Sequence, residues 1–354
     1  MKSILVFVLL LLSVFTKAQT YSGPESVEYD YAGRRWLIAN TSSHQVLSRD
    51  SSGTLSIFAS GLGSGPYGIE IVGDTLFCCS GGSVKGFLLS TGASVFNLNV
   101  GASFLNGMTH DNSGNLIATD FSAKKIFKIN IAAQTFSAIA SAMTTTPNGI
   151  VFDSLNNRCV YVNWGSNAPI CAIDMTTNAI TTLTPTTLSS CDGVTRDGSG
   201  RYYVSTWGTQ SVVQFDSSFA GPPTTVATNL SSPADIYYNV LGDTLAIPNS
   251  GNNTVTFVYF PSTVDVNEQD EISNFDLYPN PVTTGSSLNV TMKKGMHVML
   301  ELLNNQGQIV ATPVLYDFTL SEICKLETTG LKPGVYFLRV ISENRQSVKI
   351  LMID

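Results

Sequence analysis

The stretch "TPNGIVFD", residues 146–153, decides the fold because its shape returns through the chain. It is a turn followed by alternating apolar residues, which is typical of the start of a β-strand. Related stretches are "GPESVEYD" (23–30), "GPYGIEIV" (65–72), "FLNGMTHD" (104–111), "SCDGVTRD" (190–197) and "SPADIYYN" (232–239). The residues that correspond in front of the glycine position are Glu25, Tyr67, Asn106, Asn148, Asp192 and Ala234, which lie 39 to 44 residues apart.

Six units of about 42 residues follow from this spacing. The third unit contains four short β-prone runs, "GMTHD", "LIATD", "IFKIN" and "TFSAIA", separated by turn residues. This repeat predicts an all-β fold, a six-bladed β-propeller of four-stranded blades over residues 19–261. The sixth unit stops after three strands, so "QTYSG" (19–23) is the free segment expected to supply the missing outer strand.

The first 18 residues have the pattern of a cleaved signal peptide. Lys2 precedes the apolar run 4–15, and small residues follow near residue 18. The run is shorter than the roughly 20 residues needed to span a bilayer. We therefore expect export of a mature protein without a transmembrane segment.

The chain changes character after the acidic linker 262–273. Residues 274–354 show strand alternation with turns at Gly307 and Gly334, which predicts a small Ig-like β-sandwich. "YPNP" (278–281), "NNQGQIV" and "PGVYFLRV" resemble the type A C-terminal sorting domain of type IX secretion substrates. The resemblance implies that type IX secretion machinery is a partner, that the tail is removed, and that the product is secreted or attached to the outer cell surface. An unrelated binding sandwich is the alternative.

Charge and cysteine content narrow the function classes. A net charge of −7 provides no basic field for phosphate, so nucleic acid is not an expected partner. Six cysteines in an exported chain allow disulfides, and Cys159 and Cys171 flank an expected hairpin, but buried free thiols are the favoured interpretation. No zinc spacing, G-x-S-x-G motif or Walker loop is present.

The first strand of each propeller blade lines the central channel, so the six corresponding residues are expected to form a ring. Four of them, Glu25, Asn106, Asn148 and Asp192, carry oxygen ligands of the kind that Ca²⁺ or another divalent cation binds. Without a cation, Glu25 and Asp192 would repel each other. Asn and Asp before glycine are also favoured by turn geometry alone, which is the competing explanation.

These residues resemble the calcium site of the SMP-30/gluconolactonase family of six-bladed propellers. The resemblance covers about 20–262 and rests on "GPESV", "PNG" and "CDG". It implies that Glu25, Asn106, Asn148 and Asp192 hold calcium and that Asp192 is the catalytic base. The arginine that sugar-acid lactonases carry before the third-blade asparagine is absent from "GASFLNG".

Other side chains are expected at the channel mouth. The predicted substrate pocket comprises Tyr67, Phe121, Trp164, Trp207 and Asp235. Aromatic rings around a mouth suit an apolar or sugar-like ligand, while packing between blades explains each tryptophan equally well. His44 is expected in a solvated loop, and His110 is expected to be structural. Two functions remain open: a calcium-dependent hydrolase of a lactone or ester, and a non-enzymatic module that binds glycan or protein around a structural ion.

Overall fold

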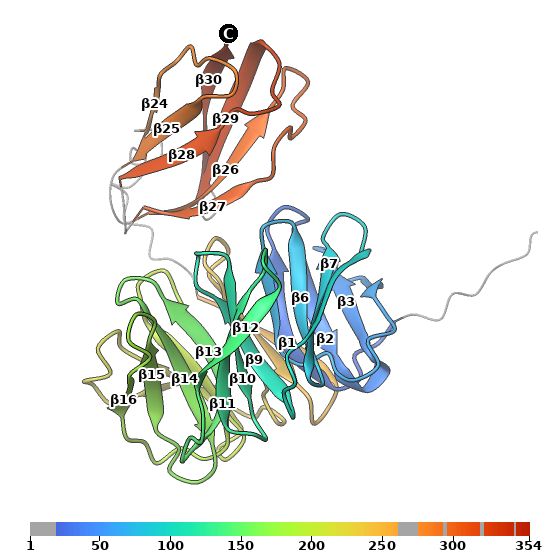
Figure 1. The fold of residues 1–354 in the computed structure, drawn as a ribbon, viewed down its shortest axis with the longest axis vertical. Helices are drawn as coiled ribbons and strands as arrows, with labels where there is room; N and C mark the ends of the chain where they lie inside the picture. Colours follow the sequence, from blue (N-terminus) through green and yellow to red (C-terminus); the bar gives the residue numbers. More distant parts are fainter. Residues whose placement is uncertain (1–18, 261–274, 293–295, 319–321, 343–344) are drawn as a thin grey trace, which may run out of the picture.

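The computed structural model describes residues 19–260, 275–292, 296–318, 322–342 and 345–354. The predicted signal peptide (1–18) and the predicted linker (262–273) lie outside the described residues. Figure 1 shows the blue-to-yellow sheets gathered in one body and the orange-to-red tail in another.

The body is a six-bladed β-propeller, as predicted, and each blade is an antiparallel sheet whose strands follow chain order. Blade one comprises β1 (Pro24–Asp30), β2 (Arg35–Asn40), the 3-10 turn η1 (Thr41–Ser43), β3 (Gln45–Arg49) and β4 (Leu55–Ala59). Blade two comprises β5 (Ile69–Val72), β6 (Thr75–Ser80), β7 (Ser83–Leu88) and β8 (Ser94–Asn99). Blade three comprises β9 (Leu105–His110), β10 (Asn115–Asp120), β11 (Lys125–Asn130) and β12 (Thr135–Ala140). Blade four comprises β13 (Thr146–Asp153), β14 (Arg158–Trp164), β15 (Ile170–Asp174) and β16 (Ile180–Thr184). Blade five comprises β17 (Cys191–Arg196), β18 (Tyr202–Thr206), β19 (Ser211–Phe215) and β20 (Thr224–Ala227), and blade six comprises β21 (Tyr237–Asn239), β22 (Thr244–Asn249) and β23 (Thr254–Tyr259).

Burial changes across each blade from the centre outward. The second strands β6 and β10 are buried along their whole length, whereas the outer strands β12 and β16 are mostly exposed. A second strand has neighbouring blades on both faces, so it is apolar without strict alternation. The cores therefore lie between blades, and separate clusters of buried side chains join neighbouring sheets.

The sixth blade differs from the prediction. Its sheet has three strands in the described part of the chain, and the N-terminal segment does not supply a fourth. Instead, the carbonyl groups of Ser22 and Gly23 accept hydrogen bonds from the blade-one turn at Ser42 and Thr41, at 3.0 and 2.9 Å. The expected four-stranded sixth blade was therefore wrong, because the few residues before β1 pair with blade one itself.

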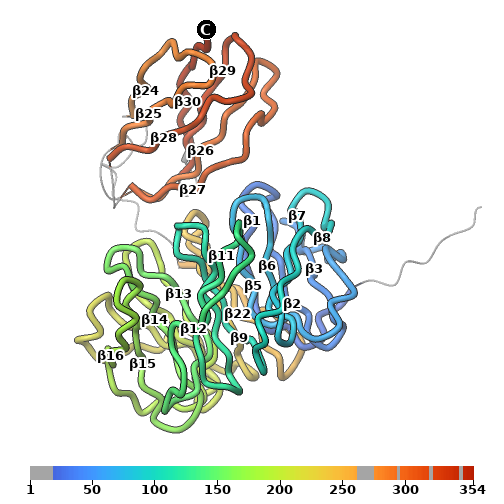
Figure 2. The backbone as a smooth tube through the Cα atoms, in the orientation of Figure 1, coloured from blue at the N-terminus to red at the C-terminus, as the bar shows by residue number. Residues whose placement is uncertain are grey.

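The ring closes between blades six and one through packing and a main-chain hydrogen bond. Strands β1 and β22 lie side by side (Figure 2). Asp235 N donates to Glu25 O at 2.8 Å. Trp36 packs edge-on against Tyr237 and tilted against Phe257, with ring centroids 6.3 and 5.2 Å apart. Aromatic packing thus joins the first blade to the last.

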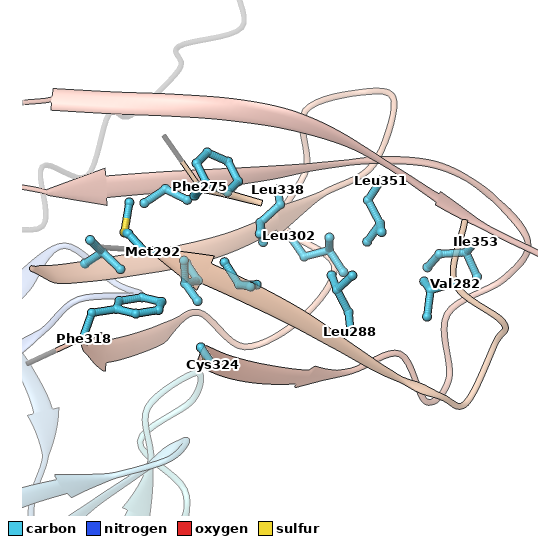
Figure 3. Close-up of a cluster of buried hydrophobic side chains, with 14 residues drawn as sticks. Phe275, Val282, Leu288, Met292, Leu302, Phe318, Cys324, Leu338, Leu351 and Ile353 are labelled. Carbon is cyan, nitrogen blue, oxygen red and sulfur yellow. The ribbon is translucent and has the colours of Figure 1, made fainter. Parts of the chain in front are cut away.

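The tail is a sandwich of two sheets. One sheet has the order β24 (Phe275–Tyr278), β25 (Ser287–Met292) and β28 (Ile323–Glu327). The other has the order β27 (Val314–Asp317), β26 (His297–Leu303), β29 (Gly334–Ser342) and β30 (Arg345–Ile353). Figure 3 shows apolar side chains from both sheets meeting between them, including Phe275, Phe318 and Leu351.

The "YPNP" motif has a structural role in the tail. Asn280 Nδ2 donates to Ile350 O at 2.8 Å, and Asn280 Oδ1 accepts from Met352 N at 2.9 Å. The motif therefore fastens the beginning of the sandwich to its last strand.

All six cysteines are free and buried. Cys159 is opposite Ile173, and Cys171 is opposite Tyr161, so the two thiols are offset by two residues across the β14–β15 pair. This offset explains why the hairpin brings them to neighbouring positions without a bridge. Burial raises the pKa of Cys191 to about 12, so its thiol stays protonated at neutral pH.

The described residues contain no helix that is both long and apolar enough to cross a membrane.

Candidate functional site

The glycines of the repeat allow the first strands to meet closely around the axis. A Cβ on Gly68 would lie 2.2 Å from Asn106 O, and one on Gly107 or Gly149 would lie 2.5 Å from the next blade's carbonyl oxygen. A real Cβ does not approach backbone this closely, so these positions require glycine. Gly68 N also donates to Asn106 O at 2.7 Å. The recurring pattern thus reflects contact between blades at the channel mouth.

Two blades replace this glycine with a polar side chain. Ser26 occupies the position in blade one and Asp235 in blade six, and Ser26 Oγ donates to Asp235 Oδ2 at 2.9 Å. Asp235 therefore adds a carboxyl to the axis. Burial raises its pKa to about 7, although the hydrogen bond from Ser26 opposes the shift.

Glu25, Asp192 and Asp235 form an acidic cluster near the first ring. Asp192 is 3% exposed. Burial, with the charge of Asp235, raises the pKa of Glu25 to about 7. Burial also raises the pKa of Asp192 well above its usual range, and the charges of Glu25 and Asp235 add to this effect. The cluster has no basic partner, since none of its three acids forms an ion pair with a basic side chain of the described residues.

Asn148 orients Asp192 and leaves one oxygen atom free. Its Nδ2 donates to Asp192 Oδ1 at 3.2 Å and to Cys191 O at 3.4 Å. Its Oδ1 is buried without a hydrogen-bond partner, and the residue is 1% exposed. A buried unsatisfied acceptor beside carboxyl groups is suited to a cation or a donor group of a ligand.

Asn106 lies between Tyr67 and Asn148 in the ring and is 7% exposed. Among the described residues, no group of three or more His, Cys, Asp and Glu side chains is arranged to hold a metal ion. An ion at the predicted position therefore needs the amide oxygens of Asn106 and Asn148 in addition to the two acids.

Five aromatic rings form an arc over four blades: Tyr67, Phe104, Phe121, Trp164 and Trp207. Successive rings meet edge-on, with centroids 4.5, 5.8, 5.9 and 5.0 Å apart. Burial raises the pKa of Tyr67 and the charge of Glu25 adds to this effect, so this end of the arc lies near the acidic cluster. At the other end of the arc, the buried indole N–H of Trp207 has no partner within hydrogen-bond geometry. It nevertheless lies close enough to Asp192 to lower the pKa of that carboxyl, against the larger rise that burial causes.

The sequence interpretation missed Phe104, whose position two residues before Asn106 was the available signal. It also missed a second ring of channel residues, three positions after the first: Glu28, Glu70, Thr109, Val151, Thr195 and Tyr237.

His44 lies in an exposed loop, and its Nδ1 contacts Gly65 O at 3.0 Å. His110 Nδ1 forms a short hydrogen bond with Glu70 Oε1.

Residues 276–354 match the family described as "Secretion system C-terminal sorting domain". The tail is a secretion sorting domain. This match supports export to the cell surface or beyond and a secretion machinery as partner. A comparison with curated proteins found no match.

Solved structures similar to the propeller include enzymes and binding proteins. A gluconolactonase from Xanthomonas campestris is 15% identical, with 69% of this chain and 88% of that chain covered and a TM-score of 0.59. The calcium-binding protein regucalcin from Agrobacterium tumefaciens is 13% identical, with 68% and 90% covered and a TM-score of 0.56. A chain of a nidogen/laminin complex is 16% identical, with 64% and 89% covered and a TM-score of 0.58. At these identities the likeness establishes the fold only.

Proposed function

We propose that the propeller is a calcium-dependent hydrolase of a lactone or ester, with Glu25, Asn106, Asn148 and Asp192 holding the ion. The observation that carries the proposal is the unpartnered Asn148 Oδ1 beside Asp192, within a cluster of carboxyl groups that lack a positive partner. The carboxyl and amide oxygens of this set are suitable ligands for Ca²⁺. When bound, the ion would supply a positive charge that polarises a substrate carbonyl.

Asp192 is the proposed general base. A carboxyl with a raised pKa is a stronger base once ionised, and a neighbouring cation lowers the pKa and so favours the ionised form that accepts a proton. The hydrogen bond from Asn148 Nδ2 fixes the position of Asp192 Oδ1, which leaves Oδ2 to accept a proton from water. Glu25 contributes negative charge for the ion, and the aromatic arc with Asp235 forms the wall of the pocket.

Asp192→Asn tests this assignment because it keeps the shape and removes the base. Turnover should fall by about 10²–10⁴-fold, the usual contribution of a general base. Calcium affinity, measured by calorimetry, should fall much less. Asp50→Asn is the matched control, since Asp50 is an exposed turn residue whose Oδ1 accepts a bond from Ser52 N. Equal losses of turnover and calcium affinity in Asp192→Asn would argue against the role of base.

The alternative is a binding module for glycan or protein with a structural ion. The similarity to a chain of a nidogen/laminin complex favours it, because that propeller fold occurs in a protein assembly. The purified protein should be assayed against lactones, aryl esters and phosphotriesters, with Ca²⁺ and with chelator. Calcium binding without turnover of any substrate would favour the binding module, and absence of calcium binding would reject the proposed site.

A further inference from the structure

The second ring of the channel and its surroundings contain titratable side chains that the proposed hydrolase does not use. Glu28 and Glu70 belong to the second ring, and His110 comes directly after Thr109, the second-ring residue of blade three. Glu28 is 8% exposed, and the side chains of Glu70 and His110 are 13% and 31% exposed. The two rings are three residues apart in every blade, so at most about 10 Å of extended chain separates them.

A cavity of about 1150 Å³ opens over this second ring. The propeller supplies its inner wall, including Glu28, Glu70, Asp235 and His110, and tail residues 312–317 border its outer side. This volume is slightly above the roughly 300–1,000 Å³ of sites that bind small organic ligands and is far larger than an ion needs.

The charges of the cavity wall are unbalanced. Asp30 is paired with Arg35 at 2.8 Å, and Glu70 with His110. Glu28 and Asp235 have no basic partner in the described chain. Burial raises the pKa of Glu28 well above its usual range, and the neighbouring charges of Glu70 and Asp235 add to this effect. A positively charged group in the cavity would relieve this repulsion.

Tyrosine rings form a further part of the wall. Tyr29 and Tyr31 meet edge-on with centroids 5.0 Å apart, and Tyr237 lies on the same cavity. The Tyr31 hydroxyl is buried and has no partner in hydrogen-bond geometry, but Tyr237 and the Val240 backbone lie close enough to oppose the rise of its pKa on burial. Tyrosine faces attract cations, and an unsatisfied hydroxyl oxygen accepts an N–H bond. A metal ion is a poor fit, since among the described residues no three His, Cys, Asp or Glu side chains of this cavity are arranged to hold one.

We propose that this cavity binds an organic ammonium ligand, a primary amine held by Glu28 and Glu70 against Tyr29, Tyr31 and Tyr237. The carboxyl groups would accept N–H bonds from the ammonium group, and the rings would contact its aliphatic part. This site lies at the second ring, shares the wall residue Asp235 with the first-ring cluster, and requires neither calcium nor hydrolysis.

Calorimetric titration of the purified protein with 1,4-diaminobutane tests the proposal, with 1,4-butanediol as the uncharged control of the same length. The diamine should bind and the diol should not. Glu28→Gln and Glu70→Gln, combined, should weaken diamine binding at least tenfold while leaving calcium binding unchanged. Glutamine has nearly the same shape as glutamate, so the double variant should fold, and circular dichroism checks this.

Three results would overturn the proposal: equal binding of diol and diamine, no binding of either, or loss of diamine binding in Asp192→Asn with retention in the double variant. The last result would place the amine at the first ring. Because calcium binding and turnover are measured separately, failure of the amine site and failure of the proposed hydrolase are distinguishable.

Discussion

The acidic cluster predicts that the ion-free propeller loses stability as pH rises. The folded-state pKa of Glu25 is raised to about 7, so folding favours its protonated form. The contribution of Glu25 to the free energy of unfolding is therefore fully present below the ordinary pKa of a glutamate and is lost as pH rises through about 7. Raising the pKa by this amount corresponds to about 3 kcal/mol, most of it lost between pH 5 and pH 8.

Thermal unfolding followed by circular dichroism in EDTA measures this effect. For a domain of this size, about 2–4 °C of melting temperature correspond to 1 kcal/mol, so the decrease between pH 5 and pH 8 should be roughly 5–12 °C. Saturating Ca²⁺ at pH 8 should restore much of the loss, because an ion at 100 times its Kd adds about 2.7 kcal/mol. Glu25→Gln should reduce the pH dependence, although burial also raises the pKa of Asp192 and of Asp235, so part of it remains; Asp50→Asn should leave it unchanged.

A melting temperature that is flat between pH 5 and pH 8 in EDTA would refute the reasoning, because it would mean that the carboxyl groups are solvated or already neutralised. If calcium does not reduce the pH dependence of the melting temperature, the burial of the acids would be supported and the proposed calcium site would be rejected.

The remaining predictions concern packing, thiols and export. Gly149→Ala places a Cβ 2.5 Å from Asp192 O and 2.7 Å from Gly193 Cα, both backbone atoms, so it should lower the free energy of unfolding by about 3 kcal/mol. In the control Gly221→Ala the nearest neighbour of the new Cβ is the side chain of Asp216, so the free energy of unfolding in denaturant should change by less than about 0.5 kcal/mol. Equal effects of the two variants would contradict the close-contact argument. Thiol titration should detect no reactive cysteine in the native protein and six in denaturant without reductant, whereas four in denaturant would show a disulfide. Deleting residues 274–354 should retain the propeller in the periplasm, and surface delivery of the truncated protein, measured by fractionation, would count against the export role of the tail.

The sequence by itself determined the blade number and the nature of the tail. The 42-residue recurrence is visible because four of the six blades need glycine where neighbouring backbones meet, as at Gly107 and Gly149. "YPNP" was recognisable because its asparagine makes specific bonds to the last strand. Such local backbone requirements restrict residue type strongly, so they appear as motifs.

The tertiary structure decided how distant residues combine. Asp235 and Ser26 are 209 residues apart, and only ring closure makes them hydrogen-bonded neighbours. The unpartnered oxygen of Asn148 also depends on its surroundings, since the sequence specifies an asparagine but not which of its atoms find partners. Strand pairing likewise set the two-residue offset between Cys159 and Cys171. The sequence determined which chemical groups line the axis; three-dimensional packing determined which charges remain unbalanced, because burial and proximity arise only when the blades meet.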